Sequence, residues 1–174
     1  MSNDTSFTIA EATTADWPWI VQGQVDIAWT RLGADGQREV SKQTVAERVD
    51  REVKRIRRDE SFPTATFVAR TVNGIRAGFV WVARTHHDFT GQLEATLLGQ
   101  YVAEAYRRQG LGRLLMATAE EWARQQGLTR ISVSVGAHNT LAQNTYKTLG
   151  FRVESLRMSR GLPKQGHGTG RTNS

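Results

Sequence analysis

The feature that most constrains this chain is a strand that runs through a glycine-containing turn into a helix, over residues 100–115. From Leu111, apolar residues recur at i, i+3, i+4, i+8, i+11 and i+12, which is the spacing of one helix face. Gly127 stands where a glycine commonly ends a helix. Gly110 and Gly112 lie in the turn, and because they carry no Cβ, they let the backbone approach a ligand closely.

The start of this predicted helix is a potential anion site. The first N–H groups of a helix have no partner inside it, and its N-terminus is positively polarised. Arg107, Arg108 and Arg113 add positive charge around the same turn. These groups together favour a phosphate, although a glycine pair after a strand is also a common tight connection. The turn is not a P-loop, which needs Gly-Lys-Ser/Thr, and it lacks the third glycine of a dinucleotide-binding fingerprint.

Two motifs resemble those of the GNAT superfamily of acyl-CoA-dependent N-acetyltransferases. Residues 107–112, Arg-x-x-Gly-x-Gly, are similar to that family's pyrophosphate-binding motif. Residues 139–151, Asn-x-x-Ala-x-x-x-Tyr-x-x-x-Gly-Phe, resemble its second motif, and the two occur in the family's order. The resemblance is sharp over residues 74–158, looser over 5–73, and absent from the C-terminal residues.

The resemblance implies that acetyl-CoA binds as the acyl donor, with its diphosphate on the turn. It also implies that the pantetheine arm lies beside a strand that splays from its parallel neighbour. Gly99 interrupts this strand, as expected for a bulge or a close ligand approach. The expected cofactor-binding residues are Tyr101, Val102, Arg107, Arg108, Gln109, Gly110, Leu111, Gly112, Arg113, Asn139 and Tyr146.

Tyr146 is the expected general acid. It shares a helix face with Ala142 and Leu149, which turns it toward the core, where its hydroxyl needs a partner. The resemblance gives this position to a tyrosine that donates a proton to the cofactor sulfur, while a packed tyrosine with a backbone partner is the alternative. Asn139 is either a helix N-cap or also a contact of the pantetheine arm.

The general base is less clearly marked. Glu94 is the expected catalytic carboxylate, acting through a water, because the place that holds a glutamate base in some family members holds Thr96 here. His86 and His87 are alternatives, and an amine that binds already neutral needs no dedicated base. The histidines form no His-x-x-x-His pair, so no metal site is expected.

The predicted fold class is α/β, with a GNAT-like mixed, mostly antiparallel sheet of about six to seven strands, four flanking helices and a splayed strand pair at the cofactor site. Trp17, Trp19 and Trp29 serve either core packing or an aromatic wall for the acceptor.

The sequence also predicts the order of the elements. In the N-terminal half we expect a strand at 7–10, a helix capped by Asp16, a loop at 33–41, a helix opened by the capping box Thr44-x-x-Glu47 and a hairpin around Asn73-Gly74. After these we expect strands at 92–102 and 131–135, a helix at 139–149 and a last strand at 151–158.

The chain of 174 residues suits one domain. We expect an N-acetyltransferase domain over residues 6–162, between a disordered N-terminus (1–5) and a disordered basic tail (163–174). The absence of cysteine excludes disulfides, thiolate metal ligands and a cysteine nucleophile. No signal-peptide or membrane-spanning pattern is visible, so we expect a cytoplasmic protein. The net charge of +6 suits an anionic cofactor and a solvated tail better than nucleic acid.

These observations predict an N-acetyltransferase that moves the acetyl group of acetyl-CoA to a primary amine of a small molecule by direct attack in a ternary complex. A protein N-terminal or lysine acetyltransferase and a non-catalytic acyl-CoA-binding module are the alternatives. Only one strand fits after the last helix, where the family often has two. We therefore expect an open acceptor site or a homodimer that completes it. The sequence names neither the acceptor amine nor the range of acyl groups.

Overall fold

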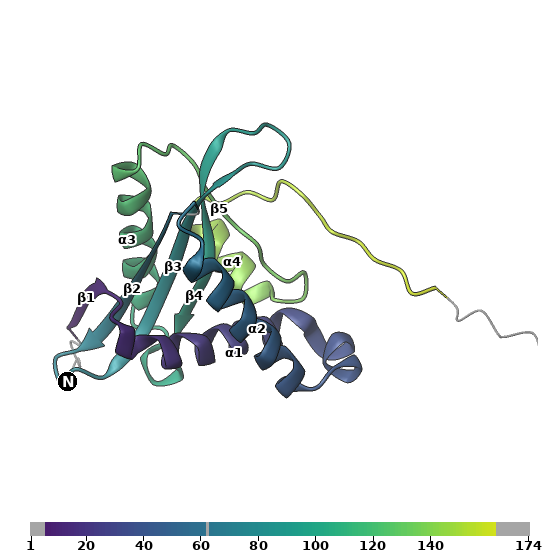
Figure 1. Cartoon of the computed structure of the whole chain (residues 1–174), viewed down its shortest axis with the longest axis horizontal. Helices are drawn as coiled ribbons and strands as arrows, with labels where there is room; N and C mark the ends of the chain where they lie inside the picture. The colour runs from purple at the N-terminus through teal and green to yellow at the C-terminus, as the bar shows by residue number, and fades with distance from the viewer. Residues whose placement is uncertain (1–5, 62, 163–174) are drawn as a thin grey trace, which may run out of the picture.

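A five-stranded sheet in the order β1-β2-β3-β4-β5 organises the chain (Figure 1). The computed structural model describes residues 6–61 and 63–162, so the expected disordered segments 1–5 and 163–174 lie outside the described residues. The strands and helices are β1 (Phe7–Glu11), η1 (Thr14–Asp16), α1 (Trp17–Glu39), α2 (Lys42–Arg58), β2 (Thr64–Thr71), β3 (Arg76–His86), β4 (Leu93–Val102), η2 (Glu104–Tyr106), α3 (Leu111–Gln125), β5 (Ile131–Val133) and α4 (Thr140–Thr148).

Helices cover both faces of the sheet. On one face α3 packs its apolar stripe, including Leu111 and Leu115, against Val80 and Val82 of β3. On the other face α1 packs against a second cluster around Phe79. Alternation along β3 therefore supplies both cores, as expected for a strand that is covered on both sides. No helix in the described part of the chain is long and apolar enough to cross a membrane.

Local turn signals in the sequence are confirmed. Asn73-Gly74 joins β2 to β3 in an antiparallel hairpin, and Gly74 has a φ of 78°, which suits glycine. At the end of α3, Gly127 has a φ of 71° and its N–H bonds to the carbonyl of Arg124. The sequence therefore predicted these element boundaries where backbone conformation requires a glycine.

The predicted bulge and splayed pair are both present. The β3–β4 register shifts after Trp81, which pairs with Gly99, whereas Val82 pairs with Leu97. The parallel β4–β5 ladder covers only residues 95–97 of β4. Since β4 continues to Val102 while β5 ends at Val133, the two strands part beyond the bulge. An opening forms there between neighbouring strands of one sheet.

The strand count is lower than expected, five instead of six to seven, and the last predicted strand is the main cause. Residues 151–162 form no helix or strand, and the segment runs away from the body of the molecule (Figure 1). Its apolar residues do not keep one alternating face, because Val153 and Leu156 have opposite parity. Both are largely exposed, at 64% and 79%. With no continuous apolar face, the segment gains little by joining the sheet.

Two predictions about the N-terminal helices need correction. The expected loop at 33–41 is largely helical, because α1 continues past a kink at Gly33 (φ 65°, ψ 179°) to Glu39. The second helix begins earlier than the capping box at Thr44 implied. Its N-cap is Ser41, whose hydroxyl oxygen accepts the N–H of Thr44 at 3.0 Å.

Candidate functional site

A pocket of about 300 Å³ opens where β4 and β5 part. Helix α1, the end of β4, the segment after β5, and α4 form its walls. The lining residues are Asp26, Ile27, Thr30, Arg31, Leu97, Gly99, Gln100, Tyr101, Val102, Arg107, Val133, Ser134, Val135, Gly136, Asn139, Ala142 and Tyr146. Of the expected cofactor-binding residues, Tyr101, Val102, Arg107, Asn139 and Tyr146 therefore meet in one pocket.

The turn before α3 presents unused backbone donors next to this pocket. Within the described chain, the N–H groups from Arg108 to Gly112 form no hydrogen bond with another residue. Gly110 is the N-cap, with a φ of 80° and no capping side chain. Arg108 has a φ of 60°, an unusual value for a residue with a side chain. The backbone is thus bent so that several donors point outward at a helix N-terminus.

The arginines of the turn remain without acidic partners. Arg107 donates from Nε to the carbonyl of Val102 at 3.1 Å, which fixes it at the pocket wall. Arg107, Arg108 and Arg113 are exposed, and no carboxylate in the described residues pairs with any of them. The turn therefore combines free N–H groups with uncompensated positive charge, which is the chemistry of a phosphate site.

Gln100 connects the turn to Tyr146. Its Nε2 donates to the carbonyl of Gly112 at 2.6 Å, and its Oε1 accepts the hydroxyl of Tyr146 at 3.1 Å. Burial raises the pKa of the Tyr146 phenol, and the Arg31 guanidinium nearby partly opposes this. A tyrosine phenol already holds its proton at neutral pH at its ordinary pKa of about 10, and this rise does not change that. Tyr146 is thus a protonated donor on the pocket wall, and its expected turn toward the core is confirmed by its packing on Phe151.

Asn139 is the N-cap of α4, since its Oδ1 accepts the N–H of Ala142 at 3.1 Å. It also lines the pocket, so the structure is compatible with a contact to the pantetheine arm as well as with the N-cap role. Tyr101 directs its ring to the face of the sheet that α1 covers. There it stacks on Phe79 with centroids 5.8 Å apart and meets Trp19 edge-on. Tyr101 also lines the pocket, to which α1 contributes residues from the same face.

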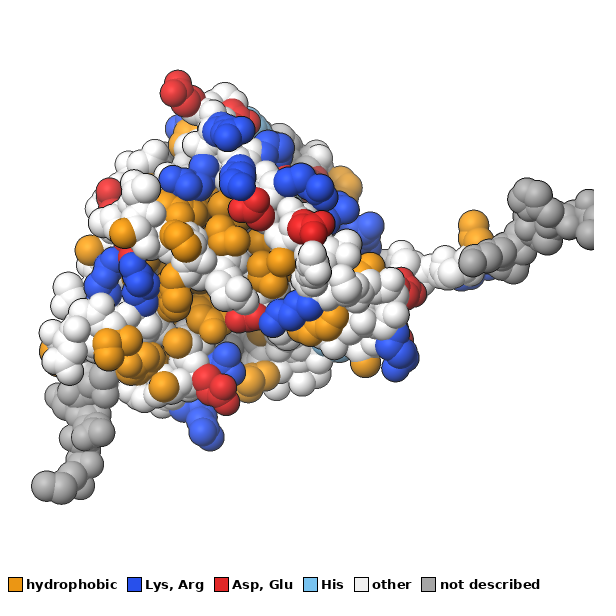
Figure 2. Space-filling model, turned by 60° about the horizontal axis from the view of Figure 1, so that its bottom comes forward, with side chains coloured by type: hydrophobic (Ala, Val, Ile, Leu, Met, Phe, Trp, Pro, Cys, Tyr) orange, Lys and Arg blue, Asp and Glu red, His pale blue; other side chains and the backbone are white. Residues whose placement is uncertain are grey.

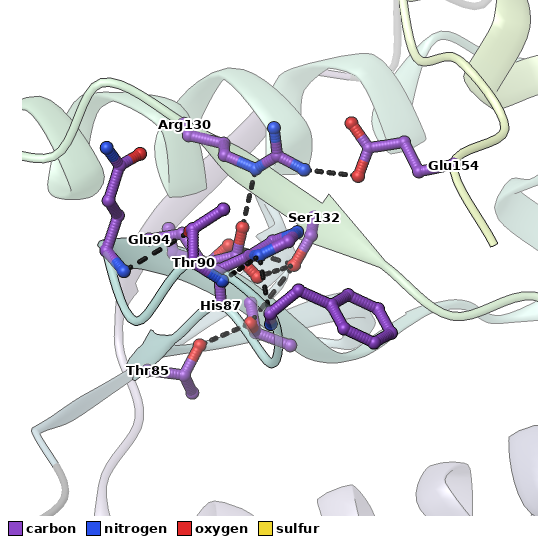
Figure 3. Close-up of polar contacts among 11 residues, drawn as sticks. Thr85, His87, Thr90, Glu94, Arg130, Ser132 and Glu154 are labelled. Atoms are coloured by element: carbon purple, nitrogen blue, oxygen red, sulfur yellow. Dashed lines mark hydrogen bonds and ion pairs between the residues drawn. The ribbon is translucent and has the colours of Figure 1, made fainter.

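Glu94 lies in a separate polar cluster and does not line the pocket (Figure 3). Its carboxylate accepts from Arg130 Nε at 2.6 Å and from the Ser132 hydroxyl at 2.9 Å. Arg130 also pairs with Glu154. The Glu94 side chain is 8% exposed and its oxygens already have donors. The structure thus gives Glu94 a structural role, and its role as a base stays a prediction.

The residues expected as alternative bases or as an acceptor wall also lie apart from the pocket. His87 accepts the N–H of Thr90 at 3.2 Å within the β3–β4 loop, and neither His86 nor His87 lines the pocket. Trp17 and Trp19 are partly buried and pack against the core, and Trp17 meets Trp81 edge-on at 5.3 Å. In the described residues, no group of three or more His, Cys, Asp or Glu is placed to hold a metal ion.

The sequence pointed to aromatic residues of α1 as a wall for the acceptor, but it did not point to Asp26 and Arg31 of the same helix. Asp26 and Arg31 both line the pocket, and Arg31 donates to the carbonyl of Ser134 at 2.7 Å across the opening. Asp26 accepts from Lys42 of α2 at 2.8 Å. No local motif marks these residues, because only the packing of α1 across the sheet brings them to the gap between β4 and β5.

Comparison with known proteins decides the family. The model of the acetyltransferase (GNAT) family matches residues 34–151, more than half of the chain. The chain belongs to the GNAT family. The matched region contains both GNAT motifs, the splayed strands and most of the pocket lining, and the sequence resemblance to this family is therefore confirmed.

Other GNAT proteins match over part of their length. The uncharacterized N-acetyltransferase YdgE of Bacillus subtilis is 34% identical over 90 residues, covering 51% of this chain and 55% of YdgE. An aminoglycoside N(6')-acetyltransferase type 1 of Serratia marcescens is 35% identical over 89 residues, covering 49% of this chain and 60% of that protein. The matched stretch spans little more than half the length of these relatives.

Solved structures share the GNAT fold over nearly the whole chain. A proposed acetyl transferase from Pyrococcus furiosus superposes with a TM-score of 0.77 at 22% identity, covering 90% of this chain and 100% of that one. AAC(6')-Iy, in complex with the bisubstrate analog CoA-S-monomethyl-acetylneamine, superposes with a TM-score of 0.62 at 16% identity, covering 91% and 100%. At such low identity these likenesses show the fold alone.

Proposed function

We propose that this protein transfers the acetyl group of acetyl-CoA to a primary amine of a small molecule, by direct attack within a ternary complex. The free N–H groups from Arg108 to Gly112, next to a pocket lined by Tyr146, carry the proposal. The relatives named as aminoglycoside acetyltransferases support a small-molecule amine as the acceptor class.

The residues present fit acetyl-CoA. The turn supplies N–H donors and three arginines without acidic partners, which suits a diphosphate. The gap between β4 and β5 exposes an unpaired strand edge beyond Leu97, which suits the amide groups of a pantetheine arm. We propose that the diphosphate lies on Arg107–Arg113, that Tyr101 and Val102 offer backbone groups to the arm, and that Asn139 and Tyr146 face its far part.

The reaction forms a C–N bond and breaks the thioester C–S bond. The amine loses one proton, and the departing thiolate gains one. Tyr146 is the proposed proton donor to the sulfur, because it lines the pocket and a tyrosine phenol is protonated at neutral pH. In the resting structure the hydroxyl donates to Gln100. To donate to the sulfur, the O–H would turn from Gln100 toward the pocket.

The proton that leaves the amine needs an acceptor. Glu94 is proposed in this role only through intervening water, because Arg130 and Ser132 already occupy its carboxylate. An amine that binds in the neutral form and passes its proton to solvent needs no such residue. The two routes differ in what replacement of Glu94 does to the rate.

The test is thiol release from acetyl-CoA over a panel of amines, with Tyr146→Phe and Glu94→Gln beside the unchanged protein. Loss of a general acid lowers rates by about 10²–10⁴-fold, so Tyr146→Phe should lower kcat by about 100-fold. The Kd for acetyl-CoA should stay within about twofold, because the ring and its packing remain. Equal kcat values would remove Tyr146 from the mechanism. A comparable fall in kcat for Glu94→Gln, with stability kept, would establish Glu94 as the base.

A further inference from the structure

Arg31 of α1 lies on the pocket wall without an acidic partner. It lines the pocket between β4 and β5, and no carboxylate within residues 6–61 and 63–162 pairs with it. The acid on the same wall, Asp26, accepts from Lys42 instead. Figure 2, in which the side of the molecule that carries α1 comes toward the reader, shows Lys and Arg side chains more prominently than Asp and Glu around the hydrophobic ones. The charge of Arg31 is therefore left to act on the pocket.

Two hydrogen bonds hold this part of α1 across the pocket opening. Arg31 Nη2 donates to the carbonyl of Ser134 at 2.7 Å, and the His138 ring nitrogen Nε2 donates to the carbonyl of Thr30 at 2.5 Å. A β-carbon at Gly33 would lie 2.9 Å from the His138 ring, so the kink of α1 packs directly on it. The guanidinium of Arg31 is thus fixed to the segment that leads from β5 into α4.

Tyr146 of α4 faces the same pocket and is subject to this charge. The charged residues that line the pocket with it are Asp26, Arg31 and Arg107. Burial raises the pKa of the Tyr146 phenol, and the Arg31 guanidinium opposes that rise. Gln100 and Phe151, which also contact Tyr146, carry no charge. Arg31 is therefore the charged side chain that acts on the phenol.

A buried phenol is a poor acid unless its conjugate base is stabilised. When Tyr146 gives its proton to the sulfur, a negative charge is left where burial disfavours it. A fixed cation nearby favours the charged form of the phenol and so lowers the cost of the transfer. An arginine suits this task, because its guanidinium is not deprotonated in proteins.

Resting on the proposed acetyl transfer, we propose that Arg31 is a positioning residue that stabilises the phenolate which Tyr146 becomes as the thiolate departs. The thioester C–S bond breaks, the proton moves from the phenol oxygen to the sulfur, and the negative charge passes from the sulfur to the phenolate. Solvent then returns a proton to the phenolate, and the proton that the amine released balances it. Arg31 acts through Tyr146 and needs no contact with either substrate.

The experiment is a double-mutant cycle on kcat, with acetyl-CoA and an amine that the unchanged protein acetylates. Arg31→Gln should lower kcat by about tenfold, less than the roughly 10²–10³-fold that loss of a donor to the reacting atoms causes. In a Tyr146→Phe background the same substitution should leave kcat within about twofold, because residues that act as a unit are not additive. Arg31→Lys keeps the positive charge and should retain most of the activity.

Two controls separate this role from a structural one. Arg38→Gln removes another arginine of α1, exposed and paired with Asp35, and should leave kcat unchanged. Circular dichroism and the Kd for acetyl-CoA, which should stay within about twofold in each variant, confirm that the fold and the pocket are kept. If only the bond to Ser134 mattered, Arg31→Gln would slow the Tyr146→Phe protein as much as the unchanged one.

Each outcome decides. An unchanged kcat in Arg31→Gln, an equal fall in both backgrounds, or a loss in Arg31→Lys as large as in Arg31→Gln overturns this inference and leaves the acetyltransferase proposal intact. A kcat that Tyr146→Phe leaves unchanged overturns it as well, since Arg31 then has no acid to act through. If the unchanged protein binds acetyl-CoA and acetylates no amine, the proposed function fails and this inference with it.

Discussion

Arginine side chains gather at the starts of both α1 and α3, but only the first group has an acidic partner within the described chain. At the start of α1, Asp16 is fully buried and accepts from the N–H and hydroxyl of Thr13, each at 2.8 Å. Arg70 and Arg76 also donate to it, at 2.6 Å and 2.7 Å. At the start of α3, N–H groups and arginines are again gathered, and no carboxylate in the described chain is among them.

The difference shows how one arrangement serves either stability or binding. Donors gathered around Asp16 are satisfied by the chain itself, so the group holds η1, α1 and the β2–β3 hairpin together. Donors gathered at Gly110 have no partner in the described chain and fit the proposed diphosphate. Substitutions at the first site should therefore lower folding stability, and substitutions at the second should weaken the binding of acetyl-CoA.

The largest expected effect is that of Asp16→Ala. Removing this carboxylate leaves two arginines facing each other without their anion, and breaking a buried ion pair costs about 3–5 kcal/mol. We expect a loss of about 3 kcal/mol in the free energy of urea unfolding, because Arg70 and Arg76 remain partly exposed, at 26% and 36%. Asp50→Ala is the matched control, since its exposed pair with Lys54 should contribute less than about 1 kcal/mol. Equal losses in the two variants would contradict the contrast.

Low pH should remove the stabilisation that the Asp16 carboxylate contributes. Burial alone raises the pKa of Asp16, but the hydrogen bonds from Arg76, Thr13 and Arg70 outweigh it and hold the pKa well below its ordinary value. The unfolded chain therefore takes up a proton first, near an ordinary pKa of about 3.9. The stabilisation is complete above that value and is lost as the pH falls toward the lower folded pKa. The difference in unfolding free energy between unchanged protein and Asp16→Asn should shrink from about pH 6 to about pH 3, and a constant difference would contradict it.

Glycine replacements at the two ends of α3 separate binding from backbone strain. Gly110 and Gly127 have φ values of 80° and 71°, and a β-carbon at either meets no atom within 4 Å. Gly110→Ala and Gly127→Ala should thus cost a similar amount of stability, about 1 kcal/mol. Only Gly110→Ala should weaken the binding of acetyl-CoA, by about tenfold (about 1.4 kcal/mol), because only Gly110 lies in the turn proposed to hold the diphosphate. Isothermal titration measures this, and equal Kd values in both variants would place the anion site elsewhere.

The smallest expected effect concerns Arg108, whose φ of 60° places a large residue in the left-handed region. Arg108→Gly should relieve this strain and raise the unfolding free energy by about 1 kcal/mol. Arg108→Ala keeps the strain and removes the same guanidinium. Both variants should bind acetyl-CoA more weakly, with a smaller dependence on salt. Stability that falls in Arg108→Gly would show that the turn is held by the arginine side chain, as the start of α1 is.

Much of the fold follows from patterns that are local in the sequence. The i, i+3, i+4 stripe of α3, the Asn73-Gly74 hairpin and the glycine that ends α3 each act within a few residues, so the sequence alone predicts them. The bulge at Gly99 was also predicted, because a glycine inside a strand has few other uses. Residues 151–158 were predicted wrongly, since apolar content without a consistent alternating face does not specify a strand.

The partners of the carboxylates and of the buried side chains are visible only in the tertiary structure. Nothing in the sequence shows that Arg130 occupies Glu94, that Arg70 and Arg76 converge on Asp16, or that Gln24 lies against Gly99. The sequence by itself determined the glycine-containing turn before α3 and the family to which the chain belongs, because backbone N–H groups and glycines act through local geometry. Only the tertiary structure decided which charged and polar side chains are satisfied and which remain for a ligand, because each of those pairings joins residues that are far apart along the chain.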